Sequence, residues 1–252
     1  MQFFVDFPHP AMVECIYRAR EEPFAMIDIP VIPGAADWIN SVFSGFDQSV
    51  TLLIHKLYEL GGDYLTLVME IISLLGKSGI FLIVLSLILA FFHKTRRFGT
   101  AMCVGLFLGA LFVNIYLKVA IARPRPYTMD FYRQLWLLVG QNVESDFCFP
   151  SGHTNAAFAA MVPVFILGKK RWSWLALVFG VLMGISRVYL VVHFPSDVVA
   201  GMITGTIAGM LGTMVALLAP RWWYRWNAVK RRDGDELEEE NEEDEECLDS
   251  AN

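Results

Sequence analysis

The sequence predicts an all-α protein: a polytopic membrane helix bundle with about five transmembrane helices, or six, and an N-terminal interfacial amphipathic helix. Three observations lead to this prediction. Of the 252 residues, 55% are apolar and only 18% are charged, which is too apolar for a water-soluble domain of this size. Hydrophobic stretches long enough to cross a bilayer recur from residue 64 onward. Clusters of basic residues lie between several of them, as in the loops of membrane proteins.

Five hydrophobic segments are candidate spans, because a helix needs about 20 apolar residues to cross a hydrocarbon core of about 30 Å. The first is longer than that and is interrupted at residues 76–79, so we interpret it as a tilted or interfacial start followed by a span. The third is short, and we expect its polar first turn to lie in a cavity instead of in lipid. The predicted segments are Tyr64–Phe92, Phe98–Ile121, Thr154–Leu167, Trp172–Val192 and Val198–Leu218.

The segment from Phe46 to Leu60 has the pattern of an amphipathic helix. Asp47 and Lys56 lie off an apolar stripe with helical spacing. Such a helix is expected to lie at the membrane surface. The stripe consists of Val50, Leu53, Ile54 and Leu57.

The basic residues predict the orientation in a plasma or inner membrane. Eleven bases lie in the connections on one side, against four in the loop from Lys118 to Gly152. The positive-inside rule therefore places the C-terminal tail in the cytoplasm and residues 122–152 outside. Twelve of the 26 acidic residues lie in residues 233–252, which predicts a disordered acidic tail and leaves 14 acids against 20 bases in the rest of the chain. This balance does not favour nucleic acid as a partner.

Three polar clusters interrupt the hydrophobic pattern, and the predicted topology brings all three to the outer face. They are the runs KVAIARPRPY at residues 118–127, PSGH at 150–153 and SRVYLVVHFPSD at 186–197. Charged groups near membrane depth are costly and usually mark functional sites. Their convergence therefore predicts one pocket.

The cations of these clusters suit a tetrahedral oxyanion, and phosphate fits best. Lys118, Arg125 and Arg187 supply charged donors. Ser151 and Gly152 open a helix, whose free backbone N–H groups and dipole favour an anion. We therefore expect a phosphate-binding pocket.

Four other residues bear on how this pocket works. Arg123 either faces phosphate or caps the helix end and meets lipid headgroups. Ser186 either binds phosphate or fixes the start of the following turn. Asp197 is the only carboxylate in the clusters, so the sequence predicts neither a metal nor another cofactor. Cys148 is interpreted as an unpaired thiol.

Two histidines complete the predicted chemistry, because phosphoryl transfer through a covalent intermediate needs a nucleophile and a general acid. Asp197 follows His193 by four residues, near enough to accept one imidazole N–H and leave the other nitrogen free to attack phosphorus. His153 has no acid nearby in sequence and is the better candidate to protonate the leaving oxygen and then activate water.

The motifs resemble the three-part signature of the type 2 phosphatidic acid phosphatase (PAP2) superfamily, in particular its bacterial membrane lipid phosphatases. The resemblance covers residues 118–197 directly and implies a metal-independent lipid phosphatase with a helical membrane core. It also implies that His193 is the nucleophile and His153 the acid, and that Lys118, Arg125, Ser151, Gly152 and Arg187 bind the phosphate. The matching motifs are Lys118-x6-Arg125-Pro126, Pro150-Ser151-Gly152-His153 and Ser186-Arg187-x5-His193-x3-Asp197.

We therefore expect an integral membrane enzyme that hydrolyses a phosphomonoester or pyrophosphate of a lipid. Undecaprenyl pyrophosphate, phosphatidylglycerophosphate, phosphatidic acid and a lipid A phosphate are all compatible substrates. A lipid phosphotransferase and a non-catalytic lipid-phosphate binder are the alternatives. A vanadate-dependent haloperoxidase has a similar site, but those enzymes are soluble. The expected domains are an N-terminal segment with the interfacial helix (1–62), a PAP2-like transmembrane phosphatase domain (63–220), and a cytoplasmic basic and aromatic anchor with the acidic tail (221–252).

Overall fold

The structure, a computed structural model, describes residues 30–139 and 142–218. Within these ranges every regular element is a helix, as predicted. The predicted basic anchor and acidic tail, and the first 29 residues of the predicted N-terminal segment, lie outside the described residues.

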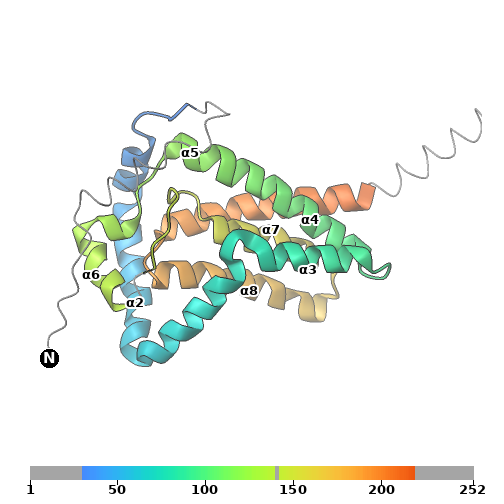
Figure 1. The fold of residues 1–252 in the computed structure, drawn as a ribbon, viewed down its shortest axis with the longest axis horizontal. Helices are drawn as coiled ribbons and strands as arrows, with labels where there is room; N and C mark the ends of the chain where they lie inside the picture. The colour runs from blue at the N-terminus through green and yellow to red at the C-terminus, as the bar shows by residue number, and fades with distance from the viewer. Residues whose placement is uncertain (1–29, 140–141, 219–252) are drawn as a thin grey trace, which may run out of the picture.

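The helices form one bundle with two elements at its end. Figure 1 shows α3, α4, α7, α8 and the last described helix running along the bundle, whereas the first half of α2 and the short α6 lie at one end of it. A π-helical turn joins α4 to α5. The bounds are α2 Ala35–Gly76, α3 Ile80–Phe91, α4 Arg96–Ala110, the π-helical turn Leu111–Leu117, α5 Lys118–Ile121, α6 Asp130–Leu138, α7 Gly152–Leu167, α8 Lys170–Tyr189 and the last helix Pro195–Leu218.

α2 bends at Gly62, whose φ of 50° is readily adopted by glycine. Before the bend, the polar side chains of Asp47, Thr51 and His55 are buried, one helical turn apart. The apolar Leu53 on the opposite face is 65% exposed. These polar side chains therefore face the bundle. Of the predicted apolar stripe, Leu53 faces outward, whereas Ile54 and Leu57 are partly buried and pack against the core. This arrangement suits a lipid environment, although the predicted interfacial location stays a prediction.

The last helix packs closely against α7 through a row of glycines. A Cβ on Gly201, Gly205 or Gly209 would lie between 2.4 and 3.0 Å from a backbone oxygen of the segment that begins at Ser151. Small residues allow two helix backbones to approach in this way. Most of α7, including its polar first turn, is buried. As expected for the short third segment, the polar turn lies inside the protein.

Three helical stretches of the described chain are long and apolar enough to cross a membrane, and they match the second, fourth and fifth predicted segments. α2 and α3 together pass the same test as one span with a bend of 53°, and they match the first segment. α7 is a shorter apolar helix at the third. The chain is thus a membrane protein, and the number of five crossings stays a prediction. The three stretches are Arg96–Thr128, Arg171–Tyr189 and Pro195–Leu218.

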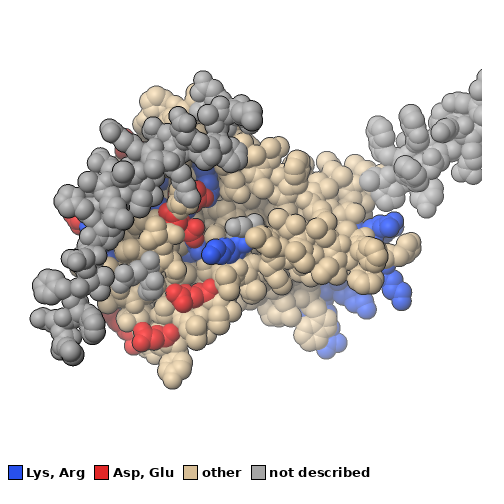
Figure 2. Space-filling model, in the orientation of Figure 1, with Lys and Arg blue, Asp and Glu red and all other residues tan. Residues whose placement is uncertain are grey.

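Charged side chains gather at opposite ends of the molecule. Figure 2 shows a cluster of Lys and Arg side chains at the right end and red acidic side chains toward the left end, where some basic side chains lie beside them. The α3–α4 and α7–α8 connections, which with the adjoining helix starts carry six of the eleven bases counted on the predicted inner side, lie at the right end in Figure 1. The bundle is therefore polarised along its length.

Candidate active site

The three polar clusters meet at the end of the bundle where α2 and α6 lie (Figure 1). The backbone N–H of Ser151 donates to the carbonyl of Asp197 at 3.0 Å, which joins the start of α7 to the start of the last helix. The guanidinium of Arg125 lies 3.0 Å from Nε2 of His193. The N–H of His193 donates to the carbonyl of Arg187 at 3.3 Å. Residues from all three motifs therefore form one site.

The three predicted phosphate-binding cations are buried and pair with two acids in the loop before α7. Asp146 accepts hydrogen bonds from both Lys118 and Arg125. Glu144 accepts one from Arg187, whose buried Nε has no partner. The two acidic side chains are 51% and 30% exposed, far more than the cations. An incoming anion can thus reach the cations by displacing the two carboxylates.

The neighbours of Asp146 favour its ionised form. Burial alone would raise its pKa, but the charges of Lys118 and Arg125 outweigh burial and hold the pKa below its usual value of 3.8. Sequence analysis missed both Asp146 and Glu144, because they lie outside the three motifs. Their position in the predicted outer loop, a few residues before the PSGH motif, is the signal that points to them.

The start of α7 has the features of an anion-binding site. Ser151 is its N-cap, and Oγ accepts hydrogen bonds from the Thr154 N–H at 3.4 Å and the Thr154 hydroxyl at 3.0 Å. The hydroxyl hydrogen of Ser151 remains available as a donor. A Cβ on Gly152 would lie 2.9 Å from Oδ1 of Asn114 and 3.5 Å from Nζ of Lys118. Glycine therefore lets the helix start approach the cations, and Asn114 is a neighbour that sequence analysis missed.

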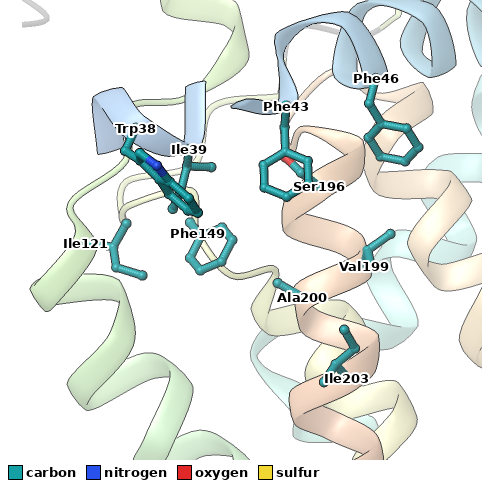
Figure 3. Close-up of a pocket in the computed structure, with 10 residues that line it drawn as sticks. All are labelled: Trp38, Ile39, Phe43, Phe46, Ile121, Phe149, Ser196, Val199, Ala200 and Ile203. Atoms are coloured by element: carbon teal, nitrogen blue, oxygen red, sulfur yellow. The ribbon is translucent and has the colours of Figure 1, made fainter. Parts of the chain in front are cut away.

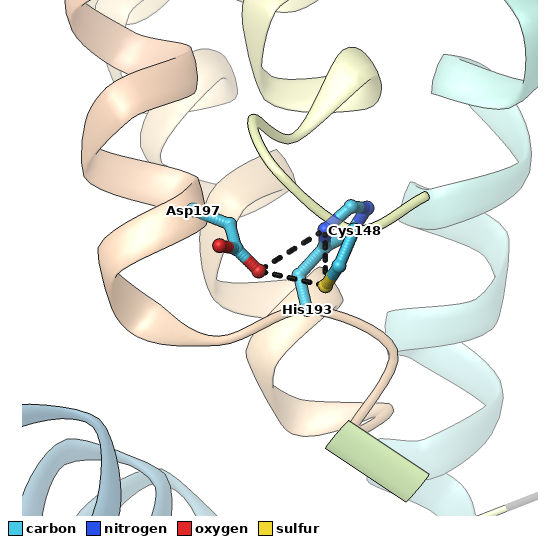
Figure 4. Close-up of side chains that lie close together, drawn as sticks. All are labelled: Cys148, His193 and Asp197. Atoms are coloured by element: carbon cyan, nitrogen blue, oxygen red, sulfur yellow. Dashed lines mark hydrogen bonds and ion pairs between the residues drawn. The ribbon is translucent and has the colours of Figure 1, made fainter. Parts of the chain in front are cut away.

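The contacts of His193 define its tautomer (Figure 4). The guanidinium of Arg125 can only donate, so Nε2 of His193 accepts and the ring proton lies on Nδ1. Nδ1 is 3.7 Å from Oδ2 of Asp197 and 3.5 Å from Sγ of Cys148. The first distance exceeds that of a hydrogen bond. Asp197 thus faces the protonated nitrogen of the ring, but a small movement is needed to close the contact.

Burial and positive charge keep the His193 ring neutral. Burial lowers the pKa of His193 well below its usual 6.5, and the charges of Arg125, Arg187 and Lys118 lower it further. A neutral imidazole carries a lone pair on Nε2. The ring is therefore in the form that a nucleophile requires.

The thiol of Cys148 belongs to the same cluster, although the sequence indicated only an unpaired cysteine. Cys148 is free, as predicted, and fully buried. Its Sγ donates to Oδ2 of Asp197 at 2.7 Å, and the Phe194 N–H donates to the same oxygen at 2.9 Å. Burial, and then the charge of Asp197, raises the pKa of Cys148 well above its usual value. The thiol is therefore a hydrogen-bond donor and not a thiolate nucleophile.

Among the described residues, Cys148, His193 and Asp197 also form the one group with the spacing of metal ligands, with donor atoms within 4.8 Å of one another. Arg125 contacts His193, however, and Arg123 contacts Asp197. Two guanidinium groups beside the ligand atoms would repel a cation. The arrangement fits hydrogen bonding within the protein better than metal binding.

The two residues with open roles have their polar atoms outside the cationic pocket. All three guanidinium nitrogens of Arg123 contact other protein groups, among them Asp47, Ser196 and Asp197. The hydroxyl of Ser186 is buried and donates to the carbonyl of Met183 at 2.7 Å. This geometry favours a structural interpretation for Ser186 and a role close to Asp197 for Arg123.

His153 lies on the α2 side of the pocket. A Cβ on Gly76 would lie 3.0 Å from Cδ2 of its ring. The ring is also within electrostatic range of Arg187, Lys118 and Arg125. The second histidine therefore faces the same group of cations as His193.

An apolar cavity of about 630 Å³ lies beside the site, between the start of α2, the end of α5 and the last helix (Figure 3). Its wall includes Phe149 and Ser196, the neighbours in sequence of the PSGH motif and of Asp197. It also includes Trp38 and Ile203, which are 63% and 56% exposed. The cavity thus extends from the loops beside the motifs to the apolar outer surface.

A buried neutral histidine beside a cluster of cations in a membrane helix bundle is the arrangement expected of a membrane phosphatase. The chain belongs to the PAP2 superfamily, because residues 98–228, just over half of its length, match the model of that superfamily. The sequence-based recognition of this family, and of a phosphatase, is confirmed.

Curated relatives and a solved structure agree with this assignment. The chain is 36% identical to phosphatidylglycerophosphatase B of Bacillus subtilis over 198 residues, which cover 74% of this chain and 90% of that protein. It is 29% identical to an undecaprenyl-diphosphatase of Sulfolobus acidocaldarius over 60% of this chain and 71% of that protein. The crystal structure of a transmembrane PAP2-type phosphatidylglycerolphosphate phosphatase from Bacillus subtilis matches with a TM-score of 0.53 and 33% identity, over 71% of this chain and 88% of that chain. The chain is therefore a membrane lipid phosphatase of the PAP2 type.

Proposed function

We propose that this protein hydrolyses a phosphomonoester or pyrophosphate of a membrane lipid through a phosphohistidine on His193, without a metal ion. One observation carries the proposal: the unprotonated Nε2 of a neutral His193 lies 3.0 Å from the guanidinium of Arg125. A phosphate bound by Arg125 is thereby brought next to the nitrogen that attacks it. Fixed cations beside the phosphate do the electrostatic work that metal ions do in other phosphoryl-transfer enzymes.

Substrate binding exchanges one set of anions for another. The lipid phosphate displaces Asp146 and Glu144 from the three cations, because a phosphate carries more charge and more acceptor oxygens than a carboxylate. The hydroxyl of Ser151 and the backbone N–H groups at the start of α7 donate to the remaining oxygens. These contacts hold phosphorus in front of His193.

The chemical steps use the two histidines in turn. Nε2 of His193 forms a bond to phosphorus while the bond to the lipid oxygen breaks, and His153, protonated once the bound phosphate offsets the charge of the cations, gives that oxygen a proton. His153 then removes a proton from water, and the resulting hydroxide attacks phosphorus and releases His193 and phosphate. Asp197 stabilises the positive charge that His193 acquires, through the proton on Nδ1.

Two observations support a lipid substrate. The apolar cavity joins the catalytic loops to the outer surface of the membrane helices, so a hydrocarbon chain fits there while the phosphate lies in the cationic pocket. The two relatives named above are a phosphatidylglycerophosphatase and an undecaprenyl-diphosphatase. Phosphatidylglycerophosphate and undecaprenyl pyrophosphate are therefore the first substrates to test, followed by phosphatidic acid and a lipid A phosphate.

The polarity of the bundle supports an active site on the extracytoplasmic face. The basic connections lie at the opposite end from the site, and such connections are normally retained in the cytoplasm. Cysteine labelling of intact cells at Glu144→Cys, in the loop beside the site, tests this orientation. Labelling by a membrane-impermeant reagent is expected at this position and not at Lys94→Cys.

Phosphate release from a panel of detergent-solubilised lipids in EDTA tests the reaction, with the His193→Ala variant as control. Release that survives the chelator and is lost in the folded variant is the expected result. Acid-labile and base-stable labelling of the protein by a ³²P-labelled lipid would identify the phosphohistidine. Metal-dependent release, or full activity of His193→Ala, would contradict the proposal. Transfer of label to an alcohol in place of water would indicate the alternative of a phosphotransferase.

A further inference from the structure

Arg123 is a buried cation outside the phosphate pocket, although it lies only two residues before Arg125. Its side chain is 1% exposed, and its carbon Cζ lies 3.9 Å above the ring of Phe194. Nε donates to Oδ1 of Asn40 at 2.8 Å, and NH1 donates to Oγ of Ser196 at 2.8 Å. The guanidinium of Arg123 therefore binds groups inside the protein and is not available to an incoming anion.

Two carboxylates bind the guanidinium of Arg123, one at each terminal nitrogen. NH2 donates to Oδ2 of Asp47 at 2.9 Å, and NH1 donates to Oδ1 of Asp197. Both carboxylates are at most 1% exposed. Buried charges require partners of opposite sign, so removal of the guanidinium would leave two unpaired carboxylates.

Asp47 comes from α2, the helix predicted to lie at the membrane surface. Oδ1 of Asp47 accepts the backbone N–H of Ser196 at 2.8 Å, and Oδ2 accepts its hydroxyl at 2.8 Å. Ser196 immediately precedes Asp197 in the chain. Asp47 therefore fixes the first turn of the last helix as well as the guanidinium.

The contact with Arg123 decides which oxygen of Asp197 faces the histidine. Because Arg123 binds Oδ1, the other oxygen, Oδ2, is the one directed toward Nδ1 of His193. The positive charge of Arg123 also favours the ionised form of Asp197. In this orientation Oδ2 can accept a hydrogen bond from the Nδ1–H of His193 after the small movement that closes the 3.7 Å separation, which supports the tautomer with an unprotonated Nε2.

We propose that Arg123 and Asp47 are positioning residues that hold Asp197 ionised and correctly oriented for His193. The inference rests on the proposed role of His193 as nucleophile. It assigns to the amphipathic helix α2 a residue that supports the catalytic pair, in addition to its predicted place at the membrane surface.

Steady-state kinetics of Arg123→Gln, Arg123→Lys and Asp47→Asn test this proposal, with Asp197→Asn for comparison. We expect Arg123→Gln to lower kcat about 100-fold and Asp47→Asn about 10-fold, with KM nearly unchanged, since loss of an orienting carboxylate itself costs up to about 10⁴-fold in comparable sites. Arg123→Lys, which keeps the charge, is expected to restore part of kcat. Asp37→Asn, an exposed acid on the same helix, is the matched control and should behave as wild type.

A double variant and an inhibitor separate positioning from a general loss of structure. Arg123→Gln combined with Asp197→Asn should be no slower than Asp197→Asn alone, because both changes disable one unit. Vanadate, a phosphate analogue, should inhibit Arg123→Gln and Asp47→Asn at nearly the wild-type concentration. Additive losses, or vanadate affinity lost together with kcat, would overturn the proposal.

The same measurements distinguish this inference from the proposed function. If His193→Ala and Asp197→Asn lose activity while Arg123→Gln and Asp47→Asn keep wild-type kcat, only the positioning role is wrong. If His193→Ala retains activity, the phosphohistidine mechanism itself is wrong.

Discussion

Sγ of Cys148 lies 2.7 Å from Oδ2 of Asp197, closer than Nδ1 of His193, which is 3.7 Å from the same oxygen. The thiol therefore donates a hydrogen bond to this carboxylate oxygen, while the imidazole N–H faces the same oxygen from beyond hydrogen-bond distance. The raised pKa of Cys148 keeps the thiol protonated, so the thiol supports the carboxylate and does not itself attack phosphorus.

The Cys148→Ala variant is expected to keep kcat within about fivefold of wild type, because the Phe194 N–H and Arg123 still bind Asp197. Phosphate release from the preferred lipid is the measurement. A loss as large as that of His193→Ala would show that the thiol takes part in the chemistry.

Replacement of Asp146 by Asn should strengthen anion binding. The carboxylate competes with phosphate for Lys118 and Arg125, so its removal is expected to lower the vanadate inhibition constant by about 3- to 10-fold. The exposed Asp130→Asn on α6 is the matched control. Weaker vanadate binding in Asp146→Asn would mean that the carboxylate organises the cations instead of competing for them.

The protonation of His193 can be followed directly. Since burial and the neighbouring cations lower its pKa, the ring should stay neutral as the pH falls through 6.5 and become charged only at clearly more acidic pH. Arg187→Gln removes one of those cations and is expected to raise the pKa. NMR of histidine-labelled protein, with His193→Gln to assign the signal, measures both values. A wild-type pKa at or above 6.5 would contradict the site geometry.

A larger side chain in the apolar cavity should discriminate between substrates. Ala200→Phe is expected to lower kcat/KM for a long-chain lipid phosphate by about 10-fold, since a blocked chain loses apolar burial. Hydrolysis of a short, water-soluble phosphate ester should be nearly unchanged. Ile207→Phe, an exposed position on the same helix, serves as the control. Equal losses for both substrates would argue against a chain in this cavity.

Close packing of the last helix on α7 should make Gly205 intolerant of substitution. A Cβ there would lie 2.4 Å from the carbonyl oxygen of Asn155, so Gly205→Ala is expected to destabilise the protein by about 1–3 kcal/mol. Gly45→Ala in α2, where a Cβ meets nothing within 4 Å, should be neutral or slightly stabilising. Thermal unfolding in detergent provides the comparison, and similar midpoints for the two variants would contradict it.

Much of the architecture could be predicted because the helices of a membrane protein are recognisable from their apolar composition. Long apolar segments locate the helices, and polar runs at their ends locate the site. The motif residues Lys118, Arg125, Ser151, His193 and Asp197 do meet at one end of the bundle. The third segment has a short apolar stretch because much of α7 is buried in the protein, where polar residues of its first turn are shielded from lipid.

The sequence by itself determined the membrane class, the helical fold and the types of residue that gather around a phosphate, because periodicity and spacing act over a few turns of helix. Only the tertiary structure decided the partners of those residues. Asp47 and Arg123 are 76 positions apart, and Cys148 and Asp197 are 49 apart. No local pattern relates such pairs, because their contacts depend on how the bend at Gly62 and the packing of the last helix orient separate elements. The same packing turns polar side chains of α2 inward and places Asp47, on a helix predicted to lie at the membrane surface, beside the candidate active site.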